Sequence, residues 1–129
     1  MESRLNELSE YRLEKAKKDL ARAKQVFDFQ DYTLATNRSY YAIFHAMRAV
    51  NALDGFDSKK HSGVIAHFNY EHVKNGDFPK EITKMIKAAM EIRHNSDYED
   101  FYIVSKDTAE KQLENAEYIV SLVDAYLNK

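Results

Sequence analysis

The segment from about residue 32 to residue 53 constrains the fold more than any other, because as a helix it is apolar on almost every side. A surface helix shows one apolar stripe, whereas a helix that is apolar all round has to be covered by its neighbours. Small residues recur along this segment at steps of three and four, which allows another helix to approach closely. We therefore predict a central helix lined by Ala42, Ala46, Ala49 and Ala52.

The rest of the chain also carries helical patterns. Residues 2–27 and 107–127 place apolar side chains at three- and four-residue steps, as amphipathic helices do. A third helix is expected from about residue 61 to 75, and a fourth should open with Pro79 in its first turn, where a missing N–H costs little. We predict an all-α fold in a single domain spanning 1–129, an up-and-down helical bundle of four core helices plus one short helix.

Single residues mark two of the helix ends. Gly55 follows the central helix at the place where a helix C-terminal cap favours glycine. Ser105 or Lys106 is expected to cap the last helix at its N-terminus. With only three glycines and one proline in the chain, long helices are favoured over turn-rich sheets.

Composition excludes several classes of protein. The chain has no cysteine, which excludes disulfide scaffolds, thiol catalysis and zinc–thiolate sites and suits a cytoplasmic protein. Its formal charge is −2, with 19 basic and 21 acidic side chains, so any contact with RNA has to be local. The most apolar stretch, residues 118–127, is too short to span a bilayer, and we expect no association with a membrane.

The first polar set with chemical potential closes the predicted fourth helix. A bundle does not need an arginine, a histidine, an aspartate and a tyrosine so close together at a helix end. Arg93 and Asp97 are four residues apart and could simply form an ion pair along the helix. Alternatively, a guanidinium beside an imidazole and a phenol could hold and polarise a phosphate. The candidate residues are Arg93, His94, Asp97 and Tyr98.

The second polar set interrupts the central helix. Asn37, Tyr41 and His45 follow one another at four-residue steps and should line one side of the helix, with Arg38 and Arg48 beside them. These side chains could be core residues that bond to neighbouring helices. If both polar sets face one groove, an imidazole from His45 or His94 could move protons while Arg93 stabilises negative charge.

The other histidines give no metal or cofactor prediction. His61 resembles a helix start, and His67 and His72 are five residues apart, a poor spacing for two ligands on one face of an α-helix. The chain also lacks a His-Glu-x-x-His motif and a glycine-rich phosphate loop. We therefore expect neither a metal site nor a bound cofactor.

Three sequence blocks resemble the HEPN superfamily, in the short bacterial and archaeal branch formerly treated as an uncharacterised protein family. They are Asn-Arg-Ser-Tyr-Tyr-Ala-Ile-Phe-His-Ala (37–46), Lys-His-Ser-Gly-Val-Ile (60–65) and Glu-Ile-Arg-His-Asn-Ser-Asp-Tyr (91–98). The resemblance covers nearly the whole chain and implies a dimeric four-helix bundle. It also implies metal-independent cleavage of RNA by an arginine and a histidine with four to six residues between them, but here Tyr98, Glu99 and Asp100 occupy the positions of that histidine.

The resemblance further implies a partner, because HEPN domains often accompany a small nucleotidyltransferase as a toxin–antitoxin or nucleotide-binding pair. Three hypotheses follow. The chain is a homodimeric, toxin-like protein that binds nucleotide or single-stranded RNA phosphate beside a nucleotidyltransferase. Alternatively, it is a metal-independent endoribonuclease that uses Arg93 with His94 or His45. In the third hypothesis it is an interaction module whose polar residues only fix the register of its helices.

Overall fold

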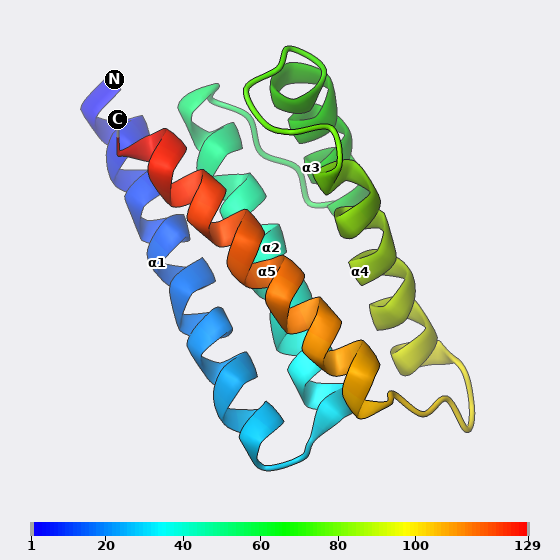
Figure 1. Cartoon of the computed structure of the whole chain (residues 1–129). Coiled ribbons are helices and arrows are strands. Elements are labelled where there is room, and N and C mark those ends of the chain that lie inside the picture. Colours follow the sequence, from blue (N-terminus) through cyan, green and yellow to red (C-terminus); the bar gives the residue numbers. More distant parts are fainter. Residues whose placement is uncertain (1, 129) are drawn as a thin grey trace.

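The structure, a computed structural model, describes residues 2–128, with side chains from residue 4 on, and these residues form an all-α bundle (Figure 1). The prediction of four core helices plus one short helix is confirmed, and no strand occurs within residues 2–128. A π-helical segment, η1 (Asn69–Val73), continues the short helix. The α-helices are α1 (Glu2–Asp28), α2 (Tyr32–Leu53), α3 (His61–Phe68), α4 (Ile82–Tyr98) and α5 (Lys106–Leu127).

Helix α2 lies at the centre, as its all-round apolar pattern predicts. It packs against α1, α3, α4 and α5. The small residues do bring a neighbour close, since Ser9 on α1 donates a hydrogen bond of 2.7 Å to the backbone carbonyl of Ala49. Its largest fully buried side chains are Tyr40, Ile43, Met47 and Val50.

The predicted end signals hold at both places. Ser105 caps α5 by accepting a hydrogen bond from the backbone N–H of Thr108. Asp54 closes α2, and Gly55 follows it with φ of +70°, a conformation that suits glycine because it has no Cβ. Asp31 caps the start of α2 through the backbone N–H of Leu34.

Two boundaries differ from the sequence prediction. Pro79 does not open α4. The backbone N–H of Ile82 bonds to the carbonyl of Pro79 in a turn, and the helix begins at Ile82. The helix expected from 61 to 75 is α-helical only to Phe68, after which the backbone widens into η1 and Lys74 bonds back to Asn69. A π-helical turn holds an extra residue, which changes the side chains that share a face.

Among residues 2–128, no helix combines the length and the apolar character that crossing a bilayer requires.

Candidate functional site

Five residues form the only partly exposed surface of α2 between positions 35 and 52, all of which the structure describes. Every other residue of that span is buried. The steps between the five are one, three, four and three residues, so they share one face of the helix. We call this surface the polar stripe; it consists of Asn37, Arg38, Tyr41, His45 and Arg48.

Arg93 reaches the polar stripe from α4. Its guanidinium carbon lies 5.1 Å from the ring centre of Tyr40 and 5.4 Å from that of Tyr41, as in cation–π contacts. The side chain of Arg93 is 25% exposed, and its Nε lies 3.6 Å from the exposed carboxylate of Asp97. That separation is too long for a hydrogen bond, and among the described residues Nε has no other acceptor. The aromatic rings therefore hold the guanidinium while leaving hydrogen-bonding capacity free.

Helix α1 supplies an acid, Asp19, to the N-terminal end of the polar stripe, where Asn37 and Arg38 lie. Nη1 of Arg38 lies 3.1 Å from Oδ1 of Asp19, and Nη2 donates to Oδ1 of Asn37 at 2.7 Å. Arg38 also lies over the ring of Tyr41, at 5.1 Å. Tyr41 thus contacts two guanidinium groups, and Asp19 offsets the charge of the one from α2.

His45 is a neutral member of the polar stripe, and its side chain is more deeply buried than those of Arg38 and Arg48. Its side chain is 13% exposed and its Nε2 lies 3.7 Å from Oδ2 of Asp19. Burial lowers the pKa of His45 to about 4, although the nearby Asp19 carboxylate opposes that shift. His45 and Arg93 both contact Tyr41, but no hydrogen bond, ion pair or ring contact among the described residues joins them directly.

His61, at the start of α3, contacts both tyrosine rings on which Arg93 lies, Tyr40 and Tyr41. Its ring stacks on Phe44 at 4.1 Å, and its Nδ1 lies 2.7 Å from the hydroxyl of Tyr40. Burial lowers the pKa of His61, and the charges of Arg93 and Arg48 lower it further. Burial also raises the pKa of Tyr40 to about 12, so its hydroxyl keeps a proton to donate. His61 is therefore a neutral ring between two guanidinium groups.

A shallow pocket of about 320 Å³ opens beside His61, lined also by Arg48 and Lys59. The acidic side chain in the lining is Asp57, and two arginines share its carboxylate. Nη2 of Arg48 lies 3.2 Å from Oδ2 of Asp57, and Nη2 of Arg12 lies 3.1 Å from the same oxygen. Nε of Arg48 is buried and, like that of Arg93, has no acceptor among the described residues. The basic groups around this pocket thus outnumber the one carboxylate that they share.

The structure separates some predicted site residues from Arg93. His94 and Tyr98 are exposed and pack on each other, with ring centres 4.9 Å apart. No hydrogen bond, ion pair or ring contact within residues 4–128 links either of them to Arg93 or to the polar stripe. Asp97 contacts Arg93 only through the loose ion pair.

Sequence reasoning undervalued His61, Tyr40 and Phe44. A helix-start position and an apolar neighbourhood do not reveal that the three rings pack together. The available signal was that His61 and the two aromatic residues all lie in the sequence blocks that carry the family resemblance.

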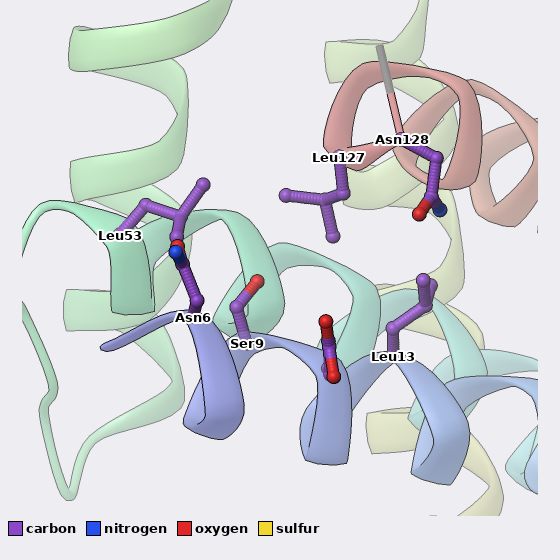
Figure 2. Close-up of a pocket in the computed structure, with 7 residues that line it drawn as sticks. Asn6, Ser9, Leu13, Leu53, Leu127 and Asn128 are labelled. Carbon is purple, nitrogen blue, oxygen red and sulfur yellow. The ribbon is translucent and has the colours of Figure 1, made fainter. Parts of the chain in front are cut away.

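A different cavity lies at the end of the bundle where α1 begins and α5 ends (Figure 2). It has a volume of about 210 Å³ and contains no basic side chain and none of the predicted site residues. Its lining gives no reason to place the candidate chemistry there; it consists of Asn6, Ser9, Glu10, Leu13, Leu53, Leu127 and Asn128.

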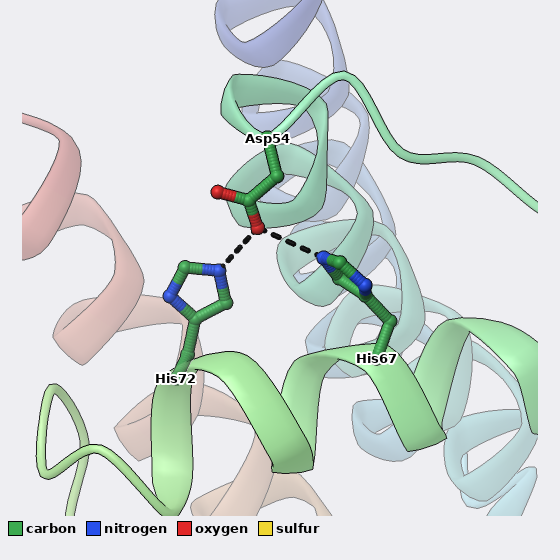
Figure 3. A group of neighbouring side chains, drawn as sticks. All are labelled: Asp54, His67 and His72. Atoms are coloured by element: carbon green, nitrogen blue, oxygen red, sulfur yellow. Dashed lines mark hydrogen bonds and ion pairs between the residues drawn. The ribbon is translucent and has the colours of Figure 1, made fainter.

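The prediction that His67 and His72 do not face the same way is wrong, because it assumed a continuous α-helix through both residues. His67 lies in α3 and His72 in the π-helical segment η1, and both rings reach Oδ2 of Asp54, at 2.9 Å from Nε2 of His67 and 2.6 Å from Nε2 of His72 (Figure 3). Asp54, His67 and His72 form a group within the described part of the chain that could hold a metal ion.

Comparisons with known proteins agree with this fold. The family model described as HEPN domain matches residues 9–126. The Methanocaldococcus jannaschii protein named "Putative toxin MJ0142" is 31% identical over 129 residues, 100% of this chain and 83% of that protein. A UPF0332 protein of Archaeoglobus fulgidus is 34% identical over 120 residues, 93% of this chain and 95% of its own length. TT1696 from Thermus thermophilus, a crystal structure, shares the fold at a TM-score of 0.77 and 20% identity, over 92% of this chain and 97% of that one.

Because burial depresses the pKa of His45, acid should destabilise the protein through this residue. The folded-state pKa is about 4 and the ordinary value is 6.5, so between these values the unfolded chain binds the proton first and stability falls as pH falls. From pH 7 to pH 4.5 the loss is about 2.5 kcal/mol at about 1.4 kcal/mol per pKa unit. Urea unfolding at both pH values should show that His45→Gln removes this loss and that His94→Gln, at an exposed site, does not. Equal pH dependence in wild type and His45→Gln would contradict the assignment.

Proposed function

The chain belongs to the HEPN family, and on this premise we propose that its polar stripe and Arg93 bind the phosphate of a nucleotide or of single-stranded RNA. The protein would act as the toxin-like half of a two-protein module in the cytoplasm. One observation carries the proposal: between positions 35 and 52 the single accessible face of the central helix is the polar one, and Arg93 from α4 lies against it.

The free donors of the site support binding of an anion. Nε of Arg48 and Nε of Arg93 are buried without an acceptor in the described structure. Buried polar groups are nearly always paired, and a planar guanidinium matches the oxygens of a phosphate. A phosphate at either arginine would satisfy such a donor once a side-chain rotation uncovers its Nε. In the tautomer in which Nδ1 accepts from Tyr40, the neutral ring of His61 could donate a further hydrogen bond from Nε2.

The aromatic rings support a nucleic acid in particular. Tyr41, the partly exposed ring of the polar stripe, contacts the guanidinium groups of Arg38 and Arg93, while the buried ring of Phe44 lies under Arg48 at 5.9 Å. Proteins that bind single strands combine such rings, on which bases stack, with basic side chains along the backbone. Because the chain as a whole is acidic, with a formal charge of −2, affinity must come from this local arrangement and not from a general basic field.

The proposed partner is a separate nucleotidyltransferase. The name of the Methanocaldococcus jannaschii relative refers to a toxin, and a second relative of that organism is named "Putative toxin MJ0605", at 34% identity over 86 residues. A toxin needs a protein that restrains it, and the family resemblance indicates a nucleotidyltransferase in that role. Co-expression with a small nucleotidyltransferase from the same genome should give a stable complex, and two proteins that separate on a sizing column would contradict this partnership.

Replacement of Arg93 is the direct test of phosphate binding. Loss of a charge-assisted contact costs about 1.5–3 kcal/mol, so Arg93→Ala should weaken binding of labelled single-stranded RNA or of ATP by roughly 10- to 100-fold. Arg93→Lys keeps the charge but loses the planar group, so its affinity should lie between that of the wild type and that of Arg93→Ala. Lys111→Ala, which removes an exposed charge from α5, is the matched control. Fluorescence anisotropy gives the affinities.

The same variants separate ligand binding from a structural role. If Arg93→Ala lowers the melting temperature but leaves affinity unchanged, the arginine only fixes the packing of α4 on α2. If the wild type binds neither ATP nor RNA, the proposed function is wrong.

A second candidate function is metal-independent cleavage of RNA. It is favoured by the position of His61, a neutral imidazole that is bonded to Tyr40 and contacts the same two tyrosine rings as Arg93. In the tautomer whose Nδ1–H donates to the hydroxyl oxygen of Tyr40, Nε2 of His61 could remove the proton of a ribose 2′-hydroxyl as that oxygen bonds to the phosphorus. The P–O5′ bond then breaks, the 5′-oxygen leaves with a proton returned by the imidazolium, and Arg93 stabilises the charge that develops. Of the imidazoles considered from the sequence, His45 shares only Tyr41 with Arg93, and His94 contacts Tyr98 instead, whereas His61 contacts both rings on which Arg93 lies.

Cleavage should therefore depend on His61. Single-stranded RNA incubated with a chelator should be cut by the wild type and by His94→Gln, and the rate should fall by at least about 100-fold in His61→Gln. A product ladder on a denaturing gel measures this. Cleavage that survives in His61→Gln, or that is absent from the wild type, rules out this mechanism.

We also propose that the protein is a homodimer joined near the connection between α4 and α5. Phe101 is 98% exposed and Ile103 86% exposed there. Phe101 also has φ of +63°, which is uncommon for a bulky side chain and costs free energy unless other contacts hold it. A second copy covering this surface would explain both features.

Light scattering should give the mass of a dimer for the wild type and of a monomer for Phe101→Asp. Phe29→Asp, at a residue that is 84% exposed in the joint between α1 and α2, is the control and should remain dimeric. A monomeric wild type would contradict the proposed assembly.

A further inference from the structure

We propose that Asp54, His67 and His72 bind a divalent transition-metal ion, with Zn²⁺ as the best fit, at the end of α2 (Figure 3). This site is separate from the polar stripe and does not depend on the proposed function. Its ligands come from the residue that caps the C-terminal end of α2, from α3 and from η1.

The geometry brings three ligand atoms to one point. Nε2 of His67 and Nε2 of His72 lie 2.9 Å and 2.6 Å from Oδ2 of Asp54, and the three atoms all lie within 4.8 Å of one another. Zn²⁺ binds such atoms at about 2.1 Å in a tetrahedral arrangement, which places them roughly 3.4 Å apart. Small side-chain shifts would admit the ion, and Asp54 and His67 have the freedom because both are partly exposed.

The hydrogen bonds of His72 fit a metal ligand, although an imidazolium that donates to both carboxylates would satisfy them too. Its other nitrogen, Nδ1, lies 3.1 Å from Oδ2 of Asp77, so both ring nitrogens face carboxylates in a side chain that is only 7% exposed. A neutral imidazole has one N–H and can donate to only one of them. If Nδ1–H donates to Asp77, a metal ion at Nε2 can take the place of the second proton. Histidine ligands characteristically have such a carboxylate behind them, which fixes the tautomer and the ring orientation.

Neighbouring contacts hold the ligands in place before an ion arrives. The ring of Phe56 stacks on His67 with centres 3.9 Å apart and planes within 4° of parallel. The η1 turn fixes the separation of the two histidines, and the backbone N–H of Asp54 is bonded to the end of α2. Little side-chain entropy is therefore left to lose on binding.

The donor set selects the class of metal. Two imidazole nitrogens and one carboxylate suit Zn²⁺, Ni²⁺ and Cu²⁺, whereas Mg²⁺ and Ca²⁺ prefer oxygen ligands throughout. Three protein ligands leave a fourth position for water, on the side where Asp54 and His67 reach solvent. The ion would join the end of α2 to α3 and η1, and would stabilise the fold by binding the native state.

The test uses the full chain after dialysis against a chelator, with Zn²⁺ alone as the probe. Calorimetric titration should show one site per chain, and excess Zn²⁺ should raise the melting temperature by at least about 5 °C. His67→Gln should weaken binding by at least about 100-fold and remove the rise. His67 is chosen because it is less buried than His72, so the variant should still fold. His94→Gln, which removes an exposed histidine, should bind as the wild type does.

Asp77→Asn tests the positioning role of Asp77, because it keeps all three ligands and changes only the group behind His72. It should lower the Zn²⁺ affinity by roughly 10- to 100-fold. The proposal is overturned if Zn²⁺ does not bind to the wild type. It is also overturned if Zn²⁺ binds equally to wild type and His67→Gln, since the ion would then be held elsewhere on the surface.

Discussion

The burial of α2 on every side but one is the constraint on which the rest of the structure depends. Four helices pack around it, and small residues let α1 approach to within a hydrogen bond of its backbone. Burial of this helix supplies much of the core, so its charged side chains are confined to the one face that stays partly exposed. The fold thus determines where polar chemistry on α2 can reach solvent.

The charges on that face are arranged to leave positive potential available. Arg38 is matched by Asp19 at 3.1 Å, but Arg48 shares its carboxylate with a second arginine, and Arg93 has only a loose contact with Asp97. Burial keeps the nearby histidines neutral at neutral pH, so they neither repel the arginines nor add charge. An acidic protein can therefore present a local site for an anion.

Sequence patterns predicted what depends on local periodicity, namely the all-α class, the central helix and the Ser105 cap. They also placed Tyr41 and His45 on one face, because four-residue steps translate directly into geometry within an α-helix. They failed where backbone geometry departs from the α-helix, as at Pro79 and between His67 and His72. Contacts between helices, such as that of His61 with Tyr40 from α2, depend on tertiary packing, which no local pattern encodes.

The most direct measurement of the central claim is residue-resolved NMR during titration with a short single-stranded RNA. If the polar stripe binds phosphate, signals of Asn37, Tyr41, Arg48 and Arg93 should shift together with one saturating dependence on concentration, while those of the outer face of α5 stay fixed. Signals that move only outside the polar stripe, or that do not move at all, would contradict the account.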